Sequence, residues 1–155
     1  MKNIEYIEFE DINCLELIDI LNQEKVREHL VSHEIFDEVL LEEWVKGKVQ
    51  VNLQRGCRVK GIKLDGAVAG WCGIQFENGS YELAIVLGAK YWGLGISVFR
   101  DVMRWASELG HTEVVLHLFN TRPEYRFLKK IASRVYESKM FGQRYISYEL
   151  RVPSS

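Results

Sequence analysis

The chain has 155 residues, 47% of them hydrophobic and 27% charged, and its formal net charge is -2. This composition is that of an ordinary globular protein and excludes a disordered or fibrous chain. The first residues lack the apolar core of a signal peptide, and no apolar run is long enough to span a bilayer. We therefore expect one globular domain over residues 1–155.

The first third of the chain predicts a strand followed by two helices. Residues 3–9 alternate apolar and polar side chains, which is typical of a short strand. An apolar stripe then runs from Ile12 to Leu30, and we expect Asp11 to cap this helix. A second amphipathic pattern runs from Ile35 to Val45 and is expected to end at Gly47.

Two hairpin signals follow these helices. Asp65-Gly66 separates the strand candidates 58–64 and 67–75, and Asn78-Gly79 precedes the strand candidate 81–87. Three strands joined by two tight turns predict an antiparallel meander.

The last part of the chain predicts a crossover followed by a second hairpin. A helical pattern ends at Gly110 and is followed by a strand at 112–119, a short helix from Pro123 to Ala132, and strands at 135–141 and 145–152. The predicted fold class is α+β, an α/β sandwich with a mixed, mostly antiparallel seven-stranded sheet and helices on both faces. The predicted order of elements is β-α-α-β-β-β-α-β-α-β-β.

The segment Lys90–Ile96 joins the strand at 81–87 to the helix that ends at Gly110. Backbone N–H groups at a helix N-terminus lack intrahelical partners, and glycines allow an anion to approach the backbone closely. The segment therefore predicts a phosphate-bearing ligand at Tyr91–Ile96. The alternative is that Gly93 and Gly95 only permit a tight turn. A dinucleotide-binding motif is disfavoured, because Val98 stands where its third glycine would be.

This order of elements and this turn resemble the GNAT acetyltransferase superfamily, whose acyl-CoA signature is Q/R-x-x-G-x-G/A. The segment from Lys90 to Gly95 matches both small positions and has lysine in place of Gln or Arg. Residues 105–110 look like the end of the family's third helix, and Asn120 looks like the asparagine that commonly ends its fifth strand. A second register places Trp92–Ser97 on the signature, although the helix length to Gly110 favours the first.

The resemblance implies that acetyl-CoA or coenzyme A is bound as the acyl donor, without a metal. The turn would bind the CoA pyrophosphate, and the end of the preceding strand would pair with pantetheine like an added strand. The cofactor-binding candidates are Ile85, Val86, Leu87, Lys90, Tyr91, Trp92, Gly93, Leu94, Gly95, Ile96 and Asn120. His29 and His33 could share a helix face, but no third ligand stands out, so solvated or capping histidines are predicted.

Acyl transfer to an amine requires a base for the amine and a proton for the leaving thiolate. Glu82 is the candidate base, because it lies on the strand before the turn among residues that would desolvate it. The resemblance implies a tyrosine acid seven residues after Asn120, but that residue is Phe127. Tyr125 is the nearby alternative for the acid. Trp44 and Trp71 could line an acceptor pocket, although core packing is the favoured interpretation.

The charges differ between the two parts of the chain. Residues 1–45 carry thirteen acids and three bases, whereas residues 46–155 carry nine acids and seventeen bases. This asymmetry indicates either two differently solvated surfaces or an acidic wall facing a cationic substrate and a basic wall facing a polyanion. The bases are not clustered with aromatic residues, so nucleic acid is not indicated.

The sequence thus predicts an N-acetyltransferase that moves an acetyl or small acyl group from acyl-CoA to a primary amine by direct attack. The acceptor would be a cationic small molecule or a protein amine. The sequence is also compatible with a homodimer. The alternative is an inactive module that binds or senses acyl-CoA. Cys14, Cys57 and Cys72 lack metal-site spacing and favour free thiols and a cytoplasmic setting, with no membrane partner.

Overall fold

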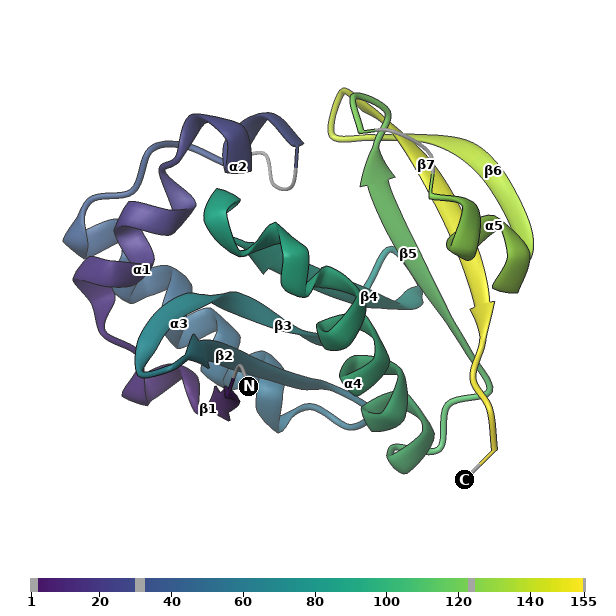
Figure 1. Cartoon of the computed structure of the whole chain (residues 1–155), viewed down its shortest axis with the longest axis horizontal. Helices are drawn as coiled ribbons and strands as arrows, with labels where there is room; N and C mark the ends of the chain where they lie inside the picture. The colour runs from purple at the N-terminus through teal and green to yellow at the C-terminus, as the bar shows by residue number, and fades with distance from the viewer. Residues whose placement is uncertain (1–2, 30–32, 123–124, 155) are drawn as a thin grey trace.

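Seven strands form one sheet in the order β1-β2-β3-β4-β5-β7-β6 (Figure 1). The computed structural model describes residues 3–29, 33–122 and 125–154. The strands are β1 Ile4–Ile7, β2 Arg58–Leu64, β3 Ala67–Glu77, β4 Ser80–Leu87, β5 Glu113–Phe119, β6 Ala132–Met140 and β7 Gln143–Arg151. The β4/β5 pair is parallel and the other neighbouring pairs are antiparallel, which confirms the predicted fold class.

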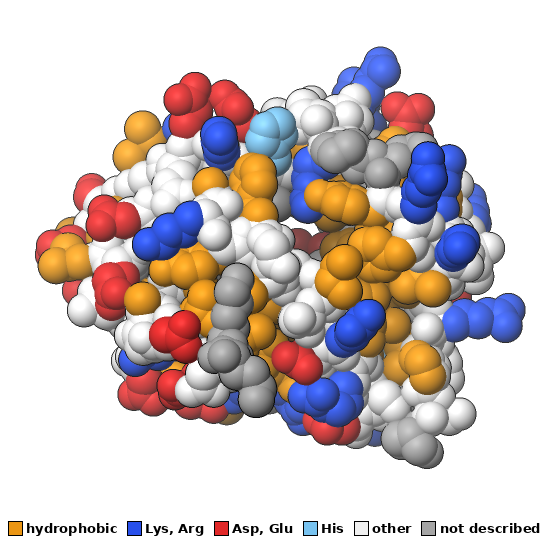
Figure 2. Space-filling model, in the orientation of Figure 1, with side chains coloured by type: hydrophobic (Ala, Val, Ile, Leu, Met, Phe, Trp, Pro, Cys, Tyr) orange, Lys and Arg blue, Asp and Glu red, His pale blue; other side chains and the backbone are white. Residues whose placement is uncertain are grey.

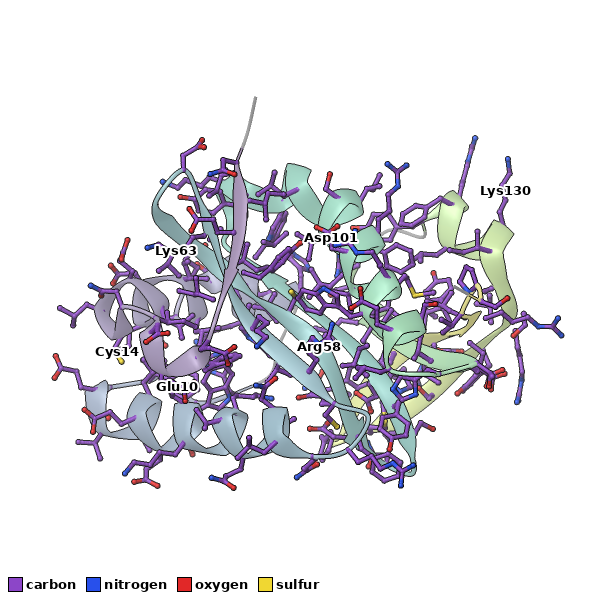
Figure 3. The ribbon with its side chains drawn as sticks, turned by 90° about the horizontal axis from the view of Figure 1, so that it is seen from below. Glu10, Cys14, Arg58, Lys63, Asp101 and Lys130 are labelled. Carbon is purple, nitrogen blue, oxygen red and sulfur yellow. The ribbon has the colours of Figure 1, made fainter. Side chains whose placement is uncertain are left out.

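Helices cover both faces of this sheet. They are α1 Cys14–Leu21, α2 Glu24–His29, α3 Glu38–Leu53, α4 Gly95–Glu108 and α5 Arg126–Ile131, with 3-10 helices η1 Phe9–Asp11 and η2 Ala89–Leu94. One apolar core packs α4 and α5 against the sheet, and a second packs α1, α2 and α3 against the other face. Figure 3 shows α3 and α4 on opposite sides of the strands that carry Arg58 and Lys63.

Both predicted hairpins are present. Asp65 and Gly66 have φ of 50° and 87°, and Asn78 and Gly79 have φ of 51° and 79°. Positive φ at both central residues is the geometry that favours Asn-Gly and Asp-Gly, because it matches the twist of the flanking strands. The second hairpin fixes the register of β3 against β4.

The first three helices differ in detail from the sequence prediction. The N-cap of α1 is Asn13 rather than Asp11, since the Asn13 side chain accepts a hydrogen bond from the Glu16 N–H at 3.1 Å. The apolar stripe that predicted one helix forms two, α1 and α2. Gly47 was expected to end the next helix but lies inside α3, which is capped by Asp37 and continues to Leu53. The continuation places Val49 and Val51 against the second core, which outweighs the low helix propensity of glycine.

The last helix and hairpin agree with the predicted pattern, with one residue outside the described part of the chain. Pro123, predicted in the first turn of a short helix, lies outside the described residues, and α5 begins at Arg126. The final hairpin turns at Phe141 and Gly142, with φ of 52° and 74°.

The sheet opens between β4 and β5. Within the described residues, the two strands register at only two positions, Glu82 with Val115 and Leu83 with Leu116. Beyond these pairs, β4 continues to Leu87 alongside β3, and β5 continues to Phe119 alongside β7. The facing edges of the two strands therefore separate from Ala84 onward, in the middle of the molecule.

Candidate active site

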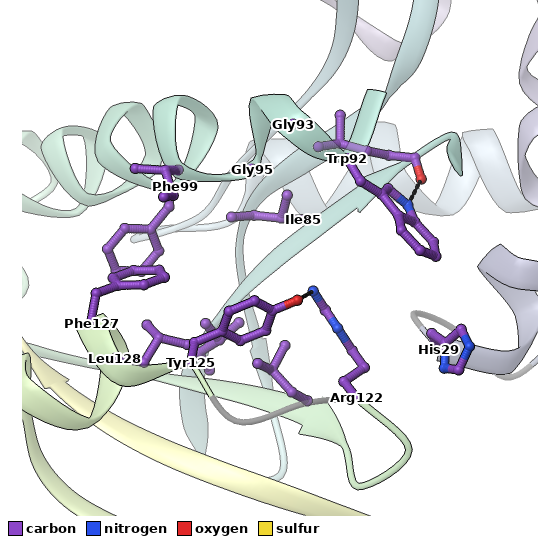
Figure 4. A pocket seen from close by; sticks show the side chains of 14 residues that line it. His29, Ile85, Trp92, Gly93, Gly95, Phe99, Arg122, Tyr125, Phe127 and Leu128 are labelled. Carbon is purple, nitrogen blue, oxygen red and sulfur yellow. Dashed lines mark hydrogen bonds between the residues drawn. The ribbon is translucent and has the colours of Figure 1, made fainter. Parts of the chain in front are cut away.

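A cavity of about 500 Å³ lies on the α4/α5 face of the opening between β4 and β5, and we call it the donor cavity. Most of its lining is apolar and comes from β4, β5, the η2–α4 turn and the start of α5 (Figure 4). The lining residues are His29, Ile85, Leu87, Trp92, Gly93, Gly95, Ile96, Phe99, Leu116, Leu118, Arg122, Tyr125, Phe127 and Leu128. Of the predicted cofactor-binding residues, Ile85, Leu87, Trp92, Gly93, Gly95 and Ile96 thus face one cavity.

The backbone conformation of the turn does not require its two glycines. The segment is the 3-10 helix η2, which runs directly into α4, and Gly95 is right-handed with φ of -52° and ψ of -44°. Gly93 is also outside the left-handed region, and a Cβ atom built on either glycine meets nothing within 4 Å. The backbone thus does not require glycine at either position, and their lack of side chains leaves open space beside the N-terminus of α4.

The edge of β4 presents alternate backbone groups to the opening. The Gly88 N–H donates to the Ala69 carbonyl of β3 at 2.9 Å. Because backbone groups alternate in direction along a strand, those of Val86 also face β3, whereas those of Ile85 and Leu87 face β5. The Leu87 carbonyl accepts a hydrogen bond from the Trp92 indole at 2.8 Å (Figure 4). Ile85 and Leu87 are therefore the residues that can pair with an extended ligand.

The remaining predicted donor residues lie around the cavity rather than in its wall. The Lys90 side chain is exposed, with its Nζ 5.0 Å from the centre of the Tyr91 ring, and Leu94 is buried. Asn120 is exposed, and its backbone N–H donates to the Arg144 carbonyl. None of these four residues lines the donor cavity, and the Tyr91 N–H already donates to the Gly88 carbonyl at 2.8 Å.

Tyr125 and Phe127 both line the donor cavity. The Tyr125 hydroxyl accepts a hydrogen bond from Arg122 Nη2 at 2.7 Å, and the two side chains point toward each other in Figure 4. Phe127 instead packs edge-on against Phe99, with ring centres 5.6 Å apart. Because the Tyr125 oxygen accepts from the guanidinium, its own proton remains available for donation. Tyr125 is thus in a place that suits a general acid, whereas Phe127 is apolar packing.

A second cavity of about 410 Å³ lies against the α1–α3 face of the same opening, and we call it the acceptor cavity. Glu82, Trp44, Trp71, Lys48 and His117 are among its lining residues. Among the residues that the structure describes, five line both cavities, namely His29, Ile85, Leu116, Leu118 and Arg122. The opening in the sheet therefore has a donor cavity on one face and an acceptor cavity on the other, with a common wall.

Glu82 contributes a titratable carboxyl group to the lining of the acceptor cavity. Burial, reinforced by the negative charge of Glu77, raises the pKa of Glu82 to about 7, although Asn78 and Lys48 oppose the shift. His117 Nε2 lies 3.7 Å from the carboxylate, and burial lowers the pKa of His117. Both groups are thus driven toward their neutral forms, so their contact is not a strong ion pair near pH 7. A carboxyl group with this pKa can accept a proton from an amine near neutral pH.

His117 is held in place by two serines behind it. Its Nδ1 lies 2.6 Å from Ser147 Oγ, which lies 2.7 Å from Ser138 Oγ. Ser147 is fully buried, so this chain of polar groups runs from the cavity into the sheet. The arrangement fixes the orientation of the imidazole that faces Glu82.

Lys48 extends from α3 across two tryptophan rings. Its Nζ lies 4.4 Å from the centre of the Trp71 ring and 5.3 Å from that of Trp44, and it donates a hydrogen bond to Gln75 Oε1 at 2.7 Å. Trp71 is 3% exposed and belongs to the core of this face, as predicted, and both tryptophans also line the acceptor cavity.

Sequence reasoning missed several polar residues of the two cavities, among them Lys48, Gln75, His117 and Arg122. A signal existed for two of them. The Asn78-Gly79 turn implies that Gln75 stands opposite Glu82, which is the observed register. Alternation along β5 also places His117 on one face with Val115 and Phe119. Lys48 and Arg122 depend on how a helix and a loop dock on the sheet, which no local pattern reveals.

The two histidines do not share a helix face, because α2 ends at His29 and His33 lies outside the helix, and each makes a polar contact of its own. His29 Nδ1 lies 3.1 Å from Thr121 Oγ1, and His33 Nδ1 lies 2.5 Å from the Glu34 carbonyl oxygen. Among the described residues, no group of three His, Cys, Asp or Glu side chains is placed to hold a metal ion.

The surface charge differs between the two sides of the opening. In Figure 2, acidic side chains gather over α1–α3 on the left and Lys and Arg side chains on the right, with a hollow edged by hydrophobic side chains between them.

Within residues 3–29, 33–122 and 125–154, no helix combines the length and apolar character needed to cross a membrane.

No protein-family model matches the chain, and no curated protein matches its sequence. Solved structures match it over nearly its whole length. The acetyltransferase of the GNAT family from Streptococcus pneumoniae is 18% identical with a TM-score of 0.65, covering 97% of this chain and 99% of that one. PaiA N-acetyltransferase from Thermoplasma acidophilum, in complex with coenzyme A, is 17% identical with a TM-score of 0.61, covering 97% and 99%. YncA from Salmonella typhimurium, with its cofactor acetyl-CoA, is 13% identical with a TM-score of 0.64, covering 100% and 96%.

These matches establish the fold. The chain has the architecture of GNAT-family acetyltransferases, as its sequence predicts, at low sequence identity. Two of these solved structures hold acetyl-CoA or coenzyme A.

Proposed function

We propose that this chain is an N-acyltransferase that moves an acetyl or small acyl group from acyl-CoA to a primary amine. The observation that carries the proposal is the opening between β4 and β5, with a cavity on each face and Glu82 on one of them. An acyl thioester entering from the donor cavity would meet an amine entering from the acceptor cavity. We further propose that residues 1–155 act as one domain, since both cavities share a single sheet.

The donor cavity suits the three chemical parts of acyl-CoA. The N-terminal end of α4 and the open space at Gly93 and Gly95 suit the pyrophosphate, because the helix dipole favours negative charge there. The backbone of Ile85 and Leu87 suits the pantetheine amides, which would take the place of the Trp92 indole at the Leu87 carbonyl. The apolar lining suits the acyl chain.

Direct transfer assigns roles to Glu82, Tyr125 and Arg122. Glu82 accepts the proton of the amine, the amine nitrogen attacks the thioester carbonyl carbon, and the carbon–sulfur bond breaks. Tyr125, with Arg122 at its oxygen, donates a proton to the leaving thiolate. The guanidinium stabilises the negative charge that develops on the hydroxyl during this transfer.

The acceptor cavity favours an amine that arrives as a cation. Aromatic rings and carboxylates attract ammonium groups, and Trp44, Trp71, Glu77 and Glu82 supply both to this cavity. The acidic surface of α1–α3 beside it would draw such an amine toward the opening. A polyamine, an aminosugar and a lysine-like amine are the acceptor classes that fit.

A second candidate function is acyl-CoA binding without turnover. Phe127 favours it, because a side chain that cannot donate a proton stands where the resemblance places the acid. Tyr125 is the residue that decides between the two candidates, since it supplies the only hydroxyl among the described residues that line the donor cavity.

The test is release of coenzyme A from acetyl-CoA in the presence of a panel of cationic, neutral and acidic amines. We expect turnover with a cationic amine, and a fall in kcat of about 10²–10⁴-fold in Glu82→Gln, with acetyl-CoA affinity unchanged. Tyr125→Phe should also lower kcat without lowering that affinity. Acetyl-CoA binding without turnover of any amine would select the second candidate, and the absence of acetyl-CoA binding would refute both.

A further inference from the structure

The acceptor cavity already contains an amine of the chain itself. Lys48 Nζ lies over Trp71 at 4.4 Å and over Trp44 at 5.3 Å, as a bound ammonium ligand would. Its side chain starts on α3, outside the sheet, and its amino group ends among the residues that line this cavity. The position proposed above for an external cationic acceptor is therefore occupied by a lysine.

The same amino group lies beside the candidate base. Lys48 Nζ donates to Gln75 Oε1 at 2.7 Å, and Gln75 is the cross-strand partner of Glu82. Side chains of directly opposed residues stand on the same face of a sheet, about 4.5–5.5 Å apart at their Cβ atoms. Gln75 is 8% exposed, so it holds the lysine in a site that excludes most water.

Burial also makes this lysine more reactive than a surface lysine. It lowers the pKa of Lys48 to about 8, although the carboxylates of Glu77 and Glu82 oppose the shift. A substantial fraction of Lys48 is therefore an uncharged amine near pH 8, and the uncharged form is the nucleophile. Lys46, two residues earlier on α3, offers a contrast, since its side chain is 73% exposed and pairs with Glu43 at the surface.

We propose that Lys48 Nζ is an internal acyl acceptor, which takes the acyl group from bound acyl-CoA when no external amine occupies the acceptor cavity. This inference rests on the proposed function, because it uses the same donor and base. The Lys48 nitrogen attacks the thioester carbonyl carbon, the new C–N bond replaces the C–S bond, and the nitrogen loses a proton to Glu82. The CoA thiolate leaves and takes a proton from Tyr125, so the products are free coenzyme A and an amide at Lys48.

Acylation would change the cavity in a defined way. The amide at Lys48 is uncharged, so the attraction between the ammonium group and the two tryptophan rings is lost. The added acyl group also fills space that an external amine needs. Modified protein should therefore turn over external amines more slowly than unmodified protein, and an external amine at saturating concentration should protect Lys48.

The experiment is incubation of the full chain with acetyl-CoA alone, followed by intact mass and peptide mapping. We expect a gain of one acetyl group, located at Lys48, in the wild type and in the matched control Lys46→Arg. Glu82→Gln should slow the modification at least tenfold, and Lys48→Arg should abolish it. Because the modified residue is mapped in the wild type, the result does not depend on how well Lys48→Arg folds.

Two results would overturn the inference. One is acetylation spread over exposed lysines, Lys46 included, at rates that Glu82→Gln does not change, which is the signature of direct chemical reaction. The other is an unmodified Lys48 in protein that releases coenzyme A with an external amine, in which case the proposed function stands and the internal acceptor does not. Absence of acetyl-CoA binding would instead refute the proposed function itself.

Discussion

Glu82 carries a carboxyl group whose pKa lies near 7 because burial and the Glu77 charge disfavour its ionised form. As the proposed base, it acts when ionised, so kcat/KM should rise with pH through about 7. Glu77→Gln removes a charge that raises the pKa of Glu82, and we therefore expect the rise to move to lower pH. Profiles of kcat/KM against pH for the wild type and this variant test the assignment, and a rise at the same pH in both would contradict it.

The Glu82 carboxyl group should make the stability of the folded state depend on pH and lower it at alkaline pH. Its folded pKa of about 7 exceeds the ordinary value of 4.5, so the folded state binds the proton more tightly than the unfolded state does. This contribution to stability is present below pH 4.5 and is lost as the pH rises through about 7. At pH 8, Glu82→Gln should therefore be more stable than the wild type, by on the order of 3 kcal/mol at most.

Denaturant unfolding at pH 4 and pH 8 measures this difference. The two proteins should unfold alike at pH 4, where the carboxyl group is protonated in both states. Equal stability at pH 8 would mean that the Glu82 carboxylate is well solvated in the folded chain. A stabilised variant that has lost activity would instead identify Glu82 as a residue kept for chemistry rather than for folding.

At the scale of single residues, sequence reasoning reached the candidate base but not its surroundings. Glu82 could be singled out because it interrupts an apolar strand before a recognisable turn. The position of Gln75 opposite Glu82 follows from the hairpin register. Lys48, however, lies in α3 just beyond Gly47, where the sequence predicted that the helix would end. Contacts between distant elements depend on packing, which the local pattern of a sequence does not encode.

The η2–α4 turn is the element whose glycines invite a direct test. Gly95 is helical, and a Cβ atom on Gly93 or Gly95 meets nothing within 4 Å. Alanine at either position should therefore leave the fold intact, and at Gly95 it should raise stability by about 0.5–1 kcal/mol. If the open space receives the pyrophosphate, both variants should weaken acetyl-CoA binding at least tenfold.

Gly47 offers the matched control for this test. Gly47 also lies in a helix, α3, with nothing within 4 Å of a built Cβ atom, but it lines neither cavity. Gly47→Ala should stabilise the protein without changing acetyl-CoA affinity. Calorimetric titration with acetyl-CoA compares the three variants, and unchanged affinity in the Gly93 and Gly95 variants would place the phosphates elsewhere.

At the scale of elements, tight turns were the most predictable parts of the fold. Asp65-Gly66 and Asn78-Gly79 favour the positive φ that a two-residue hairpin turn requires, so each pair alone predicts its hairpin. Helix ends were less predictable, because Asn13 and Asp11 are both good caps and the choice between them depends on tertiary packing. The opening between β4 and β5 has no signal of its own in the residues, and the resemblance implied only that the end of the strand at 81–87 would pair with pantetheine.

The uneven charge of the whole molecule should affect how it captures acyl-CoA. Residues 46–155 carry an excess of bases, and they include the η2–α4 turn and the strands β5, β7 and β6 on the right of Figure 1. A polyanion such as coenzyme A should be steered to this side, and salt screens such attraction over about 10 Å at 0.1 M ionic strength. Stopped-flow binding should therefore show an association rate that falls as NaCl rises, with a smaller change in the dissociation rate. An association rate independent of salt would exclude steering.

The five residues common to the two cavities have a consequence for the order of events. Because Ile85, Leu116, Leu118, Arg122 and His29 face both sides, a molecule in the donor cavity becomes part of the wall against which the acceptor rests. An amine arriving first would meet an open gap in the sheet, whereas an amine arriving after acyl-CoA would meet a completed surface. Steady-state kinetics should thus be sequential, with acyl-CoA the first molecule to bind and coenzyme A the last to leave.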